Sequence, residues 1–447
     1  MKHTEVLPSA RRLVGSLRDL GYDLPVAVAD LVDNSIAAGA TVIQLDACFE
    51  GADSWIRLSD DGSGMTEGAL MEALRFGSRR YYSATDLGKF GLGLKVASLS
   101  QCRRLTVASR STLRGRTRVG QWDLHHIEST DRWEVIRPRA RDCVLATLPL
   151  RGRTGTVVLW EKLDRILRFK SHRGQRALGE FGRLEKEIEE HLAMVFHRFL
   201  SHEARRRLPL SIFFNGRRVQ PWDPFARHES ETQELGEQKL AVNDESKAPR
   251  VAVRPYVLPS EAQFSTPTAH KVAAGPRLWN RQQGFYFYRN DRMIQAGGWN
   301  RLRTSDEHTK LARISVDFSA SADRFFELNV SKTQVRLPHG LRAELATISS
   351  AVARIAQDSY RGNSNGSQGR DLVAARIEAI REIVGMVIAG VQAVLTDELG
   401  PDSVQRIRIA RQLSGLERKL IRDVIGATQS QGSPNGAAEV EHLASHA

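Results

Sequence analysis

Hydrophobic and polar residues along the first half of the chain follow helical spacing in some segments and strand-like runs in others. Apolar side chains between Pro25 and Gly39 recur three and four positions apart, which predicts a helix that stops at the glycine. The same spacing predicts helices at 67–75, 91–99 and 184–200. Short β-branched and aromatic runs predict strands at 42–47, 55–59, 105–109, 118–124 and 156–160. Residues 1–24 lack strong periodicity, so we expect an N-terminal arm before a first domain at 25–207.

A second group of predicted strands defines a domain at 208–360. The segment Ser211–Val219 predicts a β-hairpin, because Asn-Gly is a preferred two-residue turn between strands. Further strands are predicted at 251–257, 284–288 and 314–318, with polar loops at 227–249 and 259–277.

The C-terminal part has a different composition. A linker rich in glycine, serine and asparagine is predicted at 361–370, and two helices at about 371–397 and 402–425. We expect these helices to form a hairpin domain at 371–426, followed by a disordered tail at 427–447. Their apolar stripe fits a partner helix in the same chain or in a second copy, and the sequence does not choose between the two.

Composition excludes several classes of protein. The chain has 447 residues, of which 41% are hydrophobic, so it is not disordered throughout. No apolar run reaches the ~18 residues that a membrane helix needs, and no secretory signal opens the chain. The three cysteines (Cys48, Cys102 and Cys143) are far apart and fit a reducing compartment. We therefore expect a cytoplasmic protein without a membrane partner.

The formal net charge of +13 makes nucleic acid a plausible partner. Several short stretches are crowded with arginine, and they contain Arg103, Arg104, Arg110, Arg114, Arg116, Arg118, Arg137, Arg139, Arg141, Arg205, Arg206, Arg207, Arg217 and Arg218. If these side chains share one face, duplex DNA would bind there through its phosphates; otherwise they are scattered, solvated arginines.

Four short segments contain residues suited to nucleotide chemistry. Asp30 and Asn34 are four residues apart on the first predicted helix and so share one face. This pair suits a water-activating base and an oxygen ligand for Mg²⁺, and the alternative is an ordinary polar helix face. In the second segment, Asp60 ends a strand before Gly62 and Gly64. Such a carboxylate can accept a hydrogen bond from the amine of adenine, and the alternative is a simple acidic turn.

The third segment, Gly88–Lys95, contains three glycines before a helix. Its free N–H groups and Lys95 could cradle phosphates, although the segment is not a Walker A loop. The fourth segment places Thr156 at the start of a strand, where its hydroxyl could support the adenine-binding carboxylate.

The ordered set DLVDNS, DDGSGM, GKFGLGLK and TGTVVLW resembles the N, G1, G2 and G3 boxes of the GHKL ATPases, with MORC-like and MutL-like members the most similar. The resemblance implies an α+β fold. It comprises a Bergerat-type α/β sandwich that binds ATP, a transducer domain of S5-like α/β type and C-terminal helices. It also implies a set of ATP-binding residues: Asn34, Asp60, Gly62, Gly64, Met65, Gly88, Gly91, Gly93, Leu94, Lys95 and Thr156.

The resemblance further implies a mechanism. Asp30 would act on the attacking water, Asn34 would hold Mg²⁺, and Lys332 in the transducer segment 327–333 would reach the γ-phosphate. Closure of a lid at 76–90 would accompany dimerisation, so the protein would be an ATP-gated clamp. Most relatives that hydrolyse ATP have glutamate where this chain has Asp30. The shorter side chain implies slow hydrolysis, because a misplacement of ~1 Å can cost about a hundredfold in rate.

Four other functions are alternatives to a clamp on DNA. A chaperone-like clamp on protein clients and a module that binds ATP without efficient hydrolysis both remain open. A histidine kinase is not expected, because only 29 residues precede Asp30 and a phospho-accepting hairpin would need more. Zinc hydrolysis is not expected either, because Arg206 occupies the second histidine position of the pattern that begins at His202-Glu203.

Overall fold

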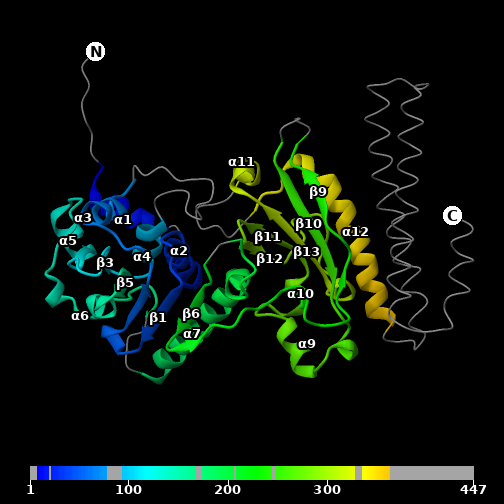
Figure 1. The fold of residues 1–447 in the computed structure, drawn as a ribbon, viewed down its shortest axis with the longest axis horizontal. Coiled ribbons are helices and arrows are strands. Elements are labelled where there is room, and N and C mark those ends of the chain that lie inside the picture. The colour runs from blue at the N-terminus through cyan, green and yellow to red at the C-terminus, as the bar shows by residue number, and fades with distance from the viewer. Residues whose placement is uncertain are drawn as a thin grey trace, which may run out of the picture.

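The computed structural model describes residues 8–19, 22–77, 93–167, 174–205, 208–243, 248–327 and 335–362. They form two units, each built on its own sheet, and the two units lie side by side along the long axis of the molecule (Figure 1). Residues 78–92 lie outside the described residues, and they include most of the predicted lid as well as Gly88 and Gly91. The same holds for Lys332 and for the predicted C-terminal helices and tail.

The first sheet has seven strands in the order β4-β3-β5-β2-β1-β6-β7. Its strands are β1 (Val42–Cys48), β2 (Trp55–Asp60), β3 (Arg104–Arg110), β4 (Arg118–Asp123), β5 (Gly155–Glu161), β6 (Ser211–Phe214) and β7 (Arg217–Arg218). Its helices are α1 (Ala10–Arg18), α2 (Leu24–Ala37), α3 (Glu67–Leu74), α4 (Gly93–Leu99), α5 (Leu124–Thr130), α6 (Val144–Thr147), α7 (Gln175–Val195) and α8 (His197–Leu200).

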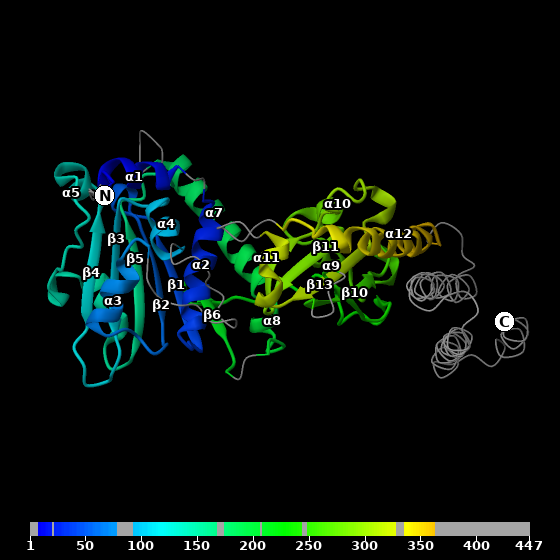
Figure 2. The same ribbon diagram turned by 90° about the horizontal axis from the view of Figure 1, so that it is seen from above.

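Alternation of side chains along the strands builds a core on each face of this sheet. Val107 and Val158 belong to the large core that includes residues of α2 and α7. Their neighbours Ala108 and Val157 point to the other face and pack with Ala146 of α6. Figure 2 shows α2, α4 and α7 on the same side of the sheet. The five strands predicted before residue 161 are all present, and each bound differs from the prediction by at most one residue.

The predicted hairpin exists, but it belongs to the first sheet. Strand β6 lies parallel to β1, with Val42 opposite Ser211, and the turn residues Asn215 and Gly216 both have positive φ angles. Ile212 and Phe214 are buried in the first core. The predicted domain boundary between residues 207 and 208 is therefore too early, because a local turn signal does not reveal which sheet a hairpin joins.

The second sheet has six strands, in the order β12-β11-β13-β10-β8 with β9 also paired to β10. They are β8 (Gln233–Glu234), β9 (Gln238–Ala241), β10 (Arg250–Val257), β11 (Gly284–Arg289), β12 (Arg292–Ala296) and β13 (Ala312–Phe318). The accompanying helices are α9 (Pro267–Ala273), α10 (Leu278–Gln282), α11 (Asp323–Phe326) and α12 (His339–Gly362). Leu341, Leu345 and Val352 of α12 join the core of this sheet.

Two predicted loops contain regular structure. Residues 227–249 include the short strands β8 and β9, whose residues are half-buried or exposed and therefore give no clear hydrophobic signal. Residues 259–277 include α9, which begins with Thr266 as its N-cap and Pro267 in its first turn.

The predicted N-terminal arm also contains a helix. In α1, Ser9 is the N-cap, and Ser9 Oγ and the Arg11 N–H both donate to Asp131 at the end of α5. Ala10 and Val14 are its buried apolar residues, too few to produce a strong periodic signal. Within the described part of the chain, no helix is both long and apolar enough to cross a bilayer.

Candidate nucleotide site

Helix α2 contributes two of the predicted site residues. The helix has Pro25 in its first turn and is apolar along most of its length, so it is buried between the sheet and α7. Asp30 is 3% exposed, and its Oδ2 accepts a 2.8 Å hydrogen bond from the Tyr22 hydroxyl. Asn34 is exposed one turn later. The two residues therefore lie in different environments although they share a helix face.

Asp60 is the point where three predicted segments meet. Its carboxylate ends β2 and is 5% exposed. Oδ2 accepts from Ser35 Oγ at 2.8 Å, and Oδ1 accepts from the backbone N–H groups of Gly62 at 3.0 Å and Thr156 at 3.1 Å. Burial raises the pKa of Asp60, and these three hydrogen bonds oppose that shift. Helix α2, the turn after β2 and strand β5 are thus tied to one carboxylate.

The glycines of the turn and of β5 allow close approach of backbone segments. Gly64 has φ +63°, and a Cβ there would overlap the Arg110 carbonyl. Gly155 has φ +137°, and a Cβ there would overlap the carbonyl oxygen of Asp60. Gly62 is less restricted, since its Cβ would meet Ala38 and Asp60 Oδ1 at 3.0 Å. Two of these glycines therefore bring protein segments together, a role that the sequence interpretation did not assign to them.

Ser109 links the turn to β5. Its hydroxyl accepts a 2.8 Å hydrogen bond from the Met65 N–H and lies 2.9 Å from the Thr156 hydroxyl. It also donates to the Gly155 carbonyl at 3.0 Å. Neither Ser35, Ser109 nor Gly155 was predicted as a site residue. Gly155 lies inside the quoted TGTVVLW segment, whereas no signal in the sequence indicated Ser109.

The start of α4 lies beside Asp30, because a Cβ on Gly93 would be 3.6 Å from Asp30 Oδ2. Leu94 is partly buried against the first core. Lys95 is 2% exposed and donates a 3.0 Å hydrogen bond to the Ala73 carbonyl. Burial lowers the pKa of Lys95 to about 8, although Glu72 acts in the opposite direction. The ammonium of Lys95 thus has a hydrogen-bond acceptor within the protein. Its contact with phosphate stays a prediction.

A residue of the second unit reaches α2. Arg292, at the start of β12, donates from Nε to Asp33 Oδ1 at 2.8 Å, and its Nη2 lies 3.9 Å from Asp30 Oδ1. The sequence analysis assigned no role to Asp33 and did not identify Arg292. The two residues are 259 positions apart, so no local pattern could have paired them.

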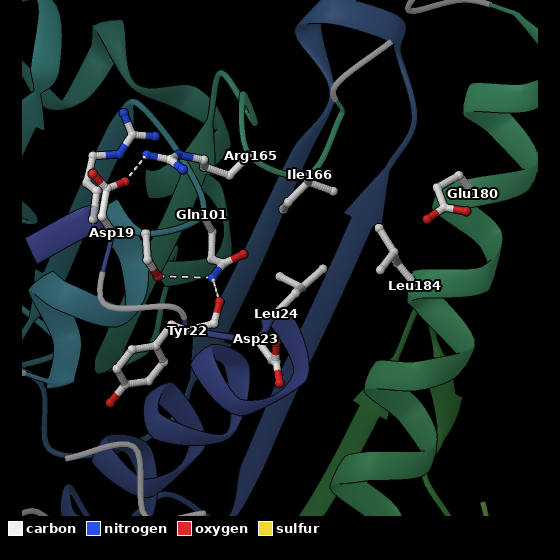
Figure 3. Close-up of a pocket in the computed structure, with 11 residues that line it drawn as sticks. Asp19, Tyr22, Asp23, Leu24, Gln101, Arg165, Ile166, Glu180 and Leu184 are labelled. Carbon is white, nitrogen blue, oxygen red and sulfur yellow. Dashed lines mark hydrogen bonds and ion pairs between the residues drawn. The ribbon is translucent and has the colours of Figure 1, made fainter. Parts of the chain in front are cut away.

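Figure 3 shows a cavity of about 470 Å³ between the end of α1, the start of α2 and α7. Gln101 fixes one wall by donating to the Tyr22 carbonyl at 2.7 Å, while Leu24, Ile166 and Leu184 provide apolar surface. None of the predicted nucleotide-binding residues is among the described residues that line it. Tyr22 is its link to the site, since the hydroxyl of this residue binds Asp30.

The described arginine-rich stretches lie at two edges of the first sheet. Arg104–Arg118 lies along β3 and β4 at one edge of the first sheet, whereas Arg217 and Arg218 form β7 at the opposite edge. Many of these side chains also face acids, as in the pairs of Arg103 with Glu128 and of Arg137 with Glu67. Binding of duplex DNA by these arginines stays a prediction.

A mixed sheet, a buried carboxylate at the end of an inner strand and an Asp/Asn helix beside it define an ATP-binding domain of the GHKL type. Residues 22–149 match the family model of histidine kinase-, DNA gyrase B-, and HSP90-like ATPases, so this part of the chain is similar to that superfamily. The match ends before β5, so Thr156 lies outside it.

Several relatives that match this chain are MutL proteins. The chain is 29% identical to the DNA mismatch repair protein MutL of Salmonella arizonae over 214 residues, which are 47% of this chain and 30% of that protein. It is 28% identical to the MutL proteins of Citrobacter koseri and Salmonella heidelberg over the same shares. The predicted resemblance to MutL is thus confirmed, whereas the MORC-like features stay a prediction.

The residues present fit a magnesium nucleotide. Mg²⁺ in such sites takes one or two protein oxygens and completes its shell with phosphates and water. Asn34 is exposed, and its amide oxygen is suited to be such a protein ligand. Among the residues that the structure describes, no group of three or more His, Cys, Asp or Glu side chains is arranged to hold a metal.

Proposed function

We propose that this chain binds ATP with Mg²⁺, hydrolyses it slowly and acts as an ATP-gated dimeric clamp. The observation that carries the proposal is the buried carboxylate of Asp60, on which helix α2, the glycine turn and β5 converge. An acceptor held in this way can bind the exocyclic amine of adenine, because its position is fixed before the ligand arrives.

The proposed chemistry is attack of water on the γ-phosphate. Asp30 would orient that water and take its proton, while Asn34 would offer its oxygen to the metal. Bound Mg²⁺ would neutralise charge on the phosphate oxygens. Gly62, Gly64, Met65 and Thr156 would frame the adenine, and Gly88, Gly91, Gly93, Leu94 and Lys95 would face the phosphates. Lys332 would complete the site from the second unit.

One observation favours slow turnover, and it also supports the alternative of a nucleotide sensor that barely hydrolyses ATP. Asp30 is shorter than glutamate by one methylene group, and its Oδ2 already accepts a hydrogen bond from Tyr22. A water molecule must therefore compete for this carboxylate or use its other oxygen. Slow hydrolysis of this kind also fits a nucleotide sensor that acts by switching between its ATP-bound and its empty form.

Single-turnover hydrolysis separates the two alternatives. We expect Asp30→Asn to lower the rate by at least about a hundredfold and to leave the affinity for a non-hydrolysable ATP analogue within about threefold. Asp23→Asn is the matched control, because Asp23 is exposed at the N-cap of the same helix and makes no side-chain cap bond. If Asp30→Asn hydrolyses ATP as fast as the wild type, the catalytic role is wrong. If neither the wild type nor Asp30→Asn hydrolyses ATP while the analogue still binds, the protein is a nucleotide sensor.

The molecular mass in solution tests the clamp, because a nucleotide-gated dimer has twice the mass of the monomer. We expect light scattering to report a doubled mass with the non-hydrolysable analogue and the smaller mass with ADP. An unchanged mass with a saturating analogue would contradict a nucleotide-gated dimer. The MutL relatives make the dimer a reasonable proposal, but the matched region spans only 30% of their length.

Duplex DNA is the proposed client. The net charge of +13 and the name of the relatives, DNA mismatch repair proteins, support it. We expect the affinity for duplex DNA to fall steeply between 50 and 200 mM salt, by about 10³-fold if six phosphates are contacted. Because the arginines lie at two edges, Arg114→Glu/Arg116→Glu and Arg217→Glu/Arg218→Glu should be compared. Stimulation of ATP turnover by an unfolded protein, and not by DNA, would instead support a chaperone-like clamp.

A further inference from the structure

Arg292 lies between two carboxylates of helix α2, although it belongs to the second unit. Arg292, Asp33 and Asp30 are 3%, 1% and 3% exposed, so the group is almost completely removed from water. Nε of Arg292 donates to Asp33 at 2.8 Å, and Nη2 lies 3.9 Å from Asp30 Oδ1. The guanidinium is also 5.8 Å from the centre of the Phe196 ring.

The charge of Arg292 matters at this place. Two carboxylates three residues apart on a buried helix repel each other and are costly to ionise, unless a cation lies between them. The neighbouring His191 does not supply that cation, because burial and the charges of Arg292 and Arg277 lower its pKa to about 3. The pairing with Arg292 therefore compensates Asp33 and keeps an attractive charge near Asp30.

The position of Arg292 is fixed by the turn that precedes β12. Asn290 and Asp291 have φ angles of 48° and 67° and reverse the chain between β11 and β12. Asp291 accepts a 2.9 Å hydrogen bond from the Arg205 N–H and lies 3.6 Å from Arg198, both on the first-unit side of the contact. A shift of the second sheet would consequently move Arg292 relative to α2.

We propose that Arg292 is a positioning residue for ATP hydrolysis, which couples strand β12 of the second unit to the carboxylates of the water-activating helix. In the docked arrangement Arg292 binds Asp33 and holds its positive charge 3.9 Å from Asp30, which keeps that carboxylate oriented. When the second unit moves away, the rate of hydrolysis falls while the nucleotide stays bound. This inference deepens the proposed function and rests on it.

The test compares four full-length variants with the wild type in two measurements: affinity for a non-hydrolysable ATP analogue and single-turnover hydrolysis at saturating ATP. We expect Arg292→Met to lower the rate about ten- to a hundredfold, with analogue affinity within about threefold. Arg292→Lys should recover part of the rate, since a cation returns. Asp33→Asn in the Arg292→Met background should also recover part of it, since the repulsion at Asp30 is reduced.

Arg289→Met is the matched control. Arg289 is a buried arginine on β11 whose guanidinium binds Asp323, a residue of the second unit, at 2.7 and 2.9 Å. Its loss should lower the thermal midpoint without a selective loss of hydrolysis by the folded protein. If Arg292→Met hydrolyses ATP like the wild type, or if Arg289→Met lowers the rate equally, the positioning role is overturned and the proposed function stands. If the wild type itself does not hydrolyse bound ATP, the positioning role and the proposed ATPase function are both overturned.

Discussion

Ser35 donates a 2.8 Å hydrogen bond to Asp60, and both side chains are buried where helix α2 meets the end of strand β2. The remaining donors to Asp60 are backbone N–H groups of Gly62 and Thr156, which cannot rotate. Only the hydroxyl of Ser35 can exchange its role from donor to acceptor. This difference allows the charge of Asp60 to be removed with little change in shape.

Asp60→Asn is expected to lower the affinity for ATP while the fold is retained. The amide oxygen can keep the hydrogen bonds from Gly62 and Thr156, and the amide nitrogen can donate to Ser35. What is lost is an acceptor for the amine of adenine, which should cost about 1–3 kcal/mol, or roughly five- to 150-fold in affinity. Calorimetry with a non-hydrolysable ATP analogue measures this change.

Asp61→Asn is the control for that variant. Asp61 accepts hydrogen bonds from the Thr41 and Val42 N–H groups at 2.7 and 2.9 Å, away from the proposed adenine position. Burial alone would raise the pKa of Asp61, but these bonds and the Thr41 hydroxyl lower it. The variant should lose stability and keep its affinity for the analogue. Unchanged affinity in Asp60→Asn would rule out its contact with adenine.

Gly155→Ala is expected to destabilise the protein and to disturb the same site. Its φ of +137° is unfavourable for alanine, and the new Cβ would overlap the backbone of Asp60, which cannot move aside like a flexible side chain. We expect a loss of about 2–4 kcal/mol in the free energy of unfolding, measured with urea. Gly152→Ala is the matched control, because Gly152 has φ +74° but open space around it, and should cost about 1 kcal/mol.

The Gly155 contact illustrates what the sequence could and could not predict. Strands β1, β2, β3, β5, β10 and β13 follow local runs of β-branched and aromatic residues, so their approximate bounds were predictable. The reason for the glycine at 155 is the carbonyl of Asp60 on a neighbouring strand, and a local pattern does not show which backbone segments approach each other.

The same limit applies to the partners of Asp33 and of the 211–218 hairpin. The Asn-Gly turn was recognisable, but pairing of β6 with β1 depends on a segment about 170 residues earlier in the chain. Arg292 reaches α2 only because the second sheet packs against α7 and α8. The candidate residues named from the sequence therefore all lie on short local segments, whereas a residue such as Arg292, which only a tertiary contact brings to α2, could not be named.

His197 should make the protein sensitive to acid. It is buried on α8 with Nε2 2.9 Å from the Tyr288 hydroxyl, and burial lowers its pKa to about 3. The unfolded chain binds a proton near pH 6.5, so the folded state is favoured fully above that pH and progressively less as pH falls toward 3. The free energy of unfolding should fall by up to about 1.4 kcal/mol per pH unit in this window.

Urea unfolding at pH 7.5 and 5.0 tests this dependence against His197→Gln. The glutamine amide can still reach a hydrogen bond with Tyr288 but takes up no proton. We expect the wild type to lose about 2 kcal/mol more than the variant between the two pH values. Equal losses would show that His197 is not the group that responds.

Lys95 should couple ATP binding to pH. Burial lowers its pKa from the ordinary value of 10.5 to about 8 in the folded protein, because the charged ammonium is disfavoured in the interior. The folded state is therefore destabilised by the full cost of burying the ammonium below pH 8, and by none of it above pH 10.5. Lys95→Met is therefore expected to raise the free energy of unfolding at pH 7. If phosphates approach Lys95 as the sequence predicts, ATP favours the ammonium form and raises that pKa.

The affinity of the wild type for the ATP analogue should then decrease as pH rises through 8, approaching tenfold per pH unit. Lys95→Met should bind more weakly at pH 7.5 and show no decrease up to pH 9.5. Lys95→Arg should also lack the decrease, because a guanidinium stays protonated throughout this range. A wild-type profile as flat as that of both variants would mean that Lys95 remains on the Ala73 carbonyl and does not meet the phosphates.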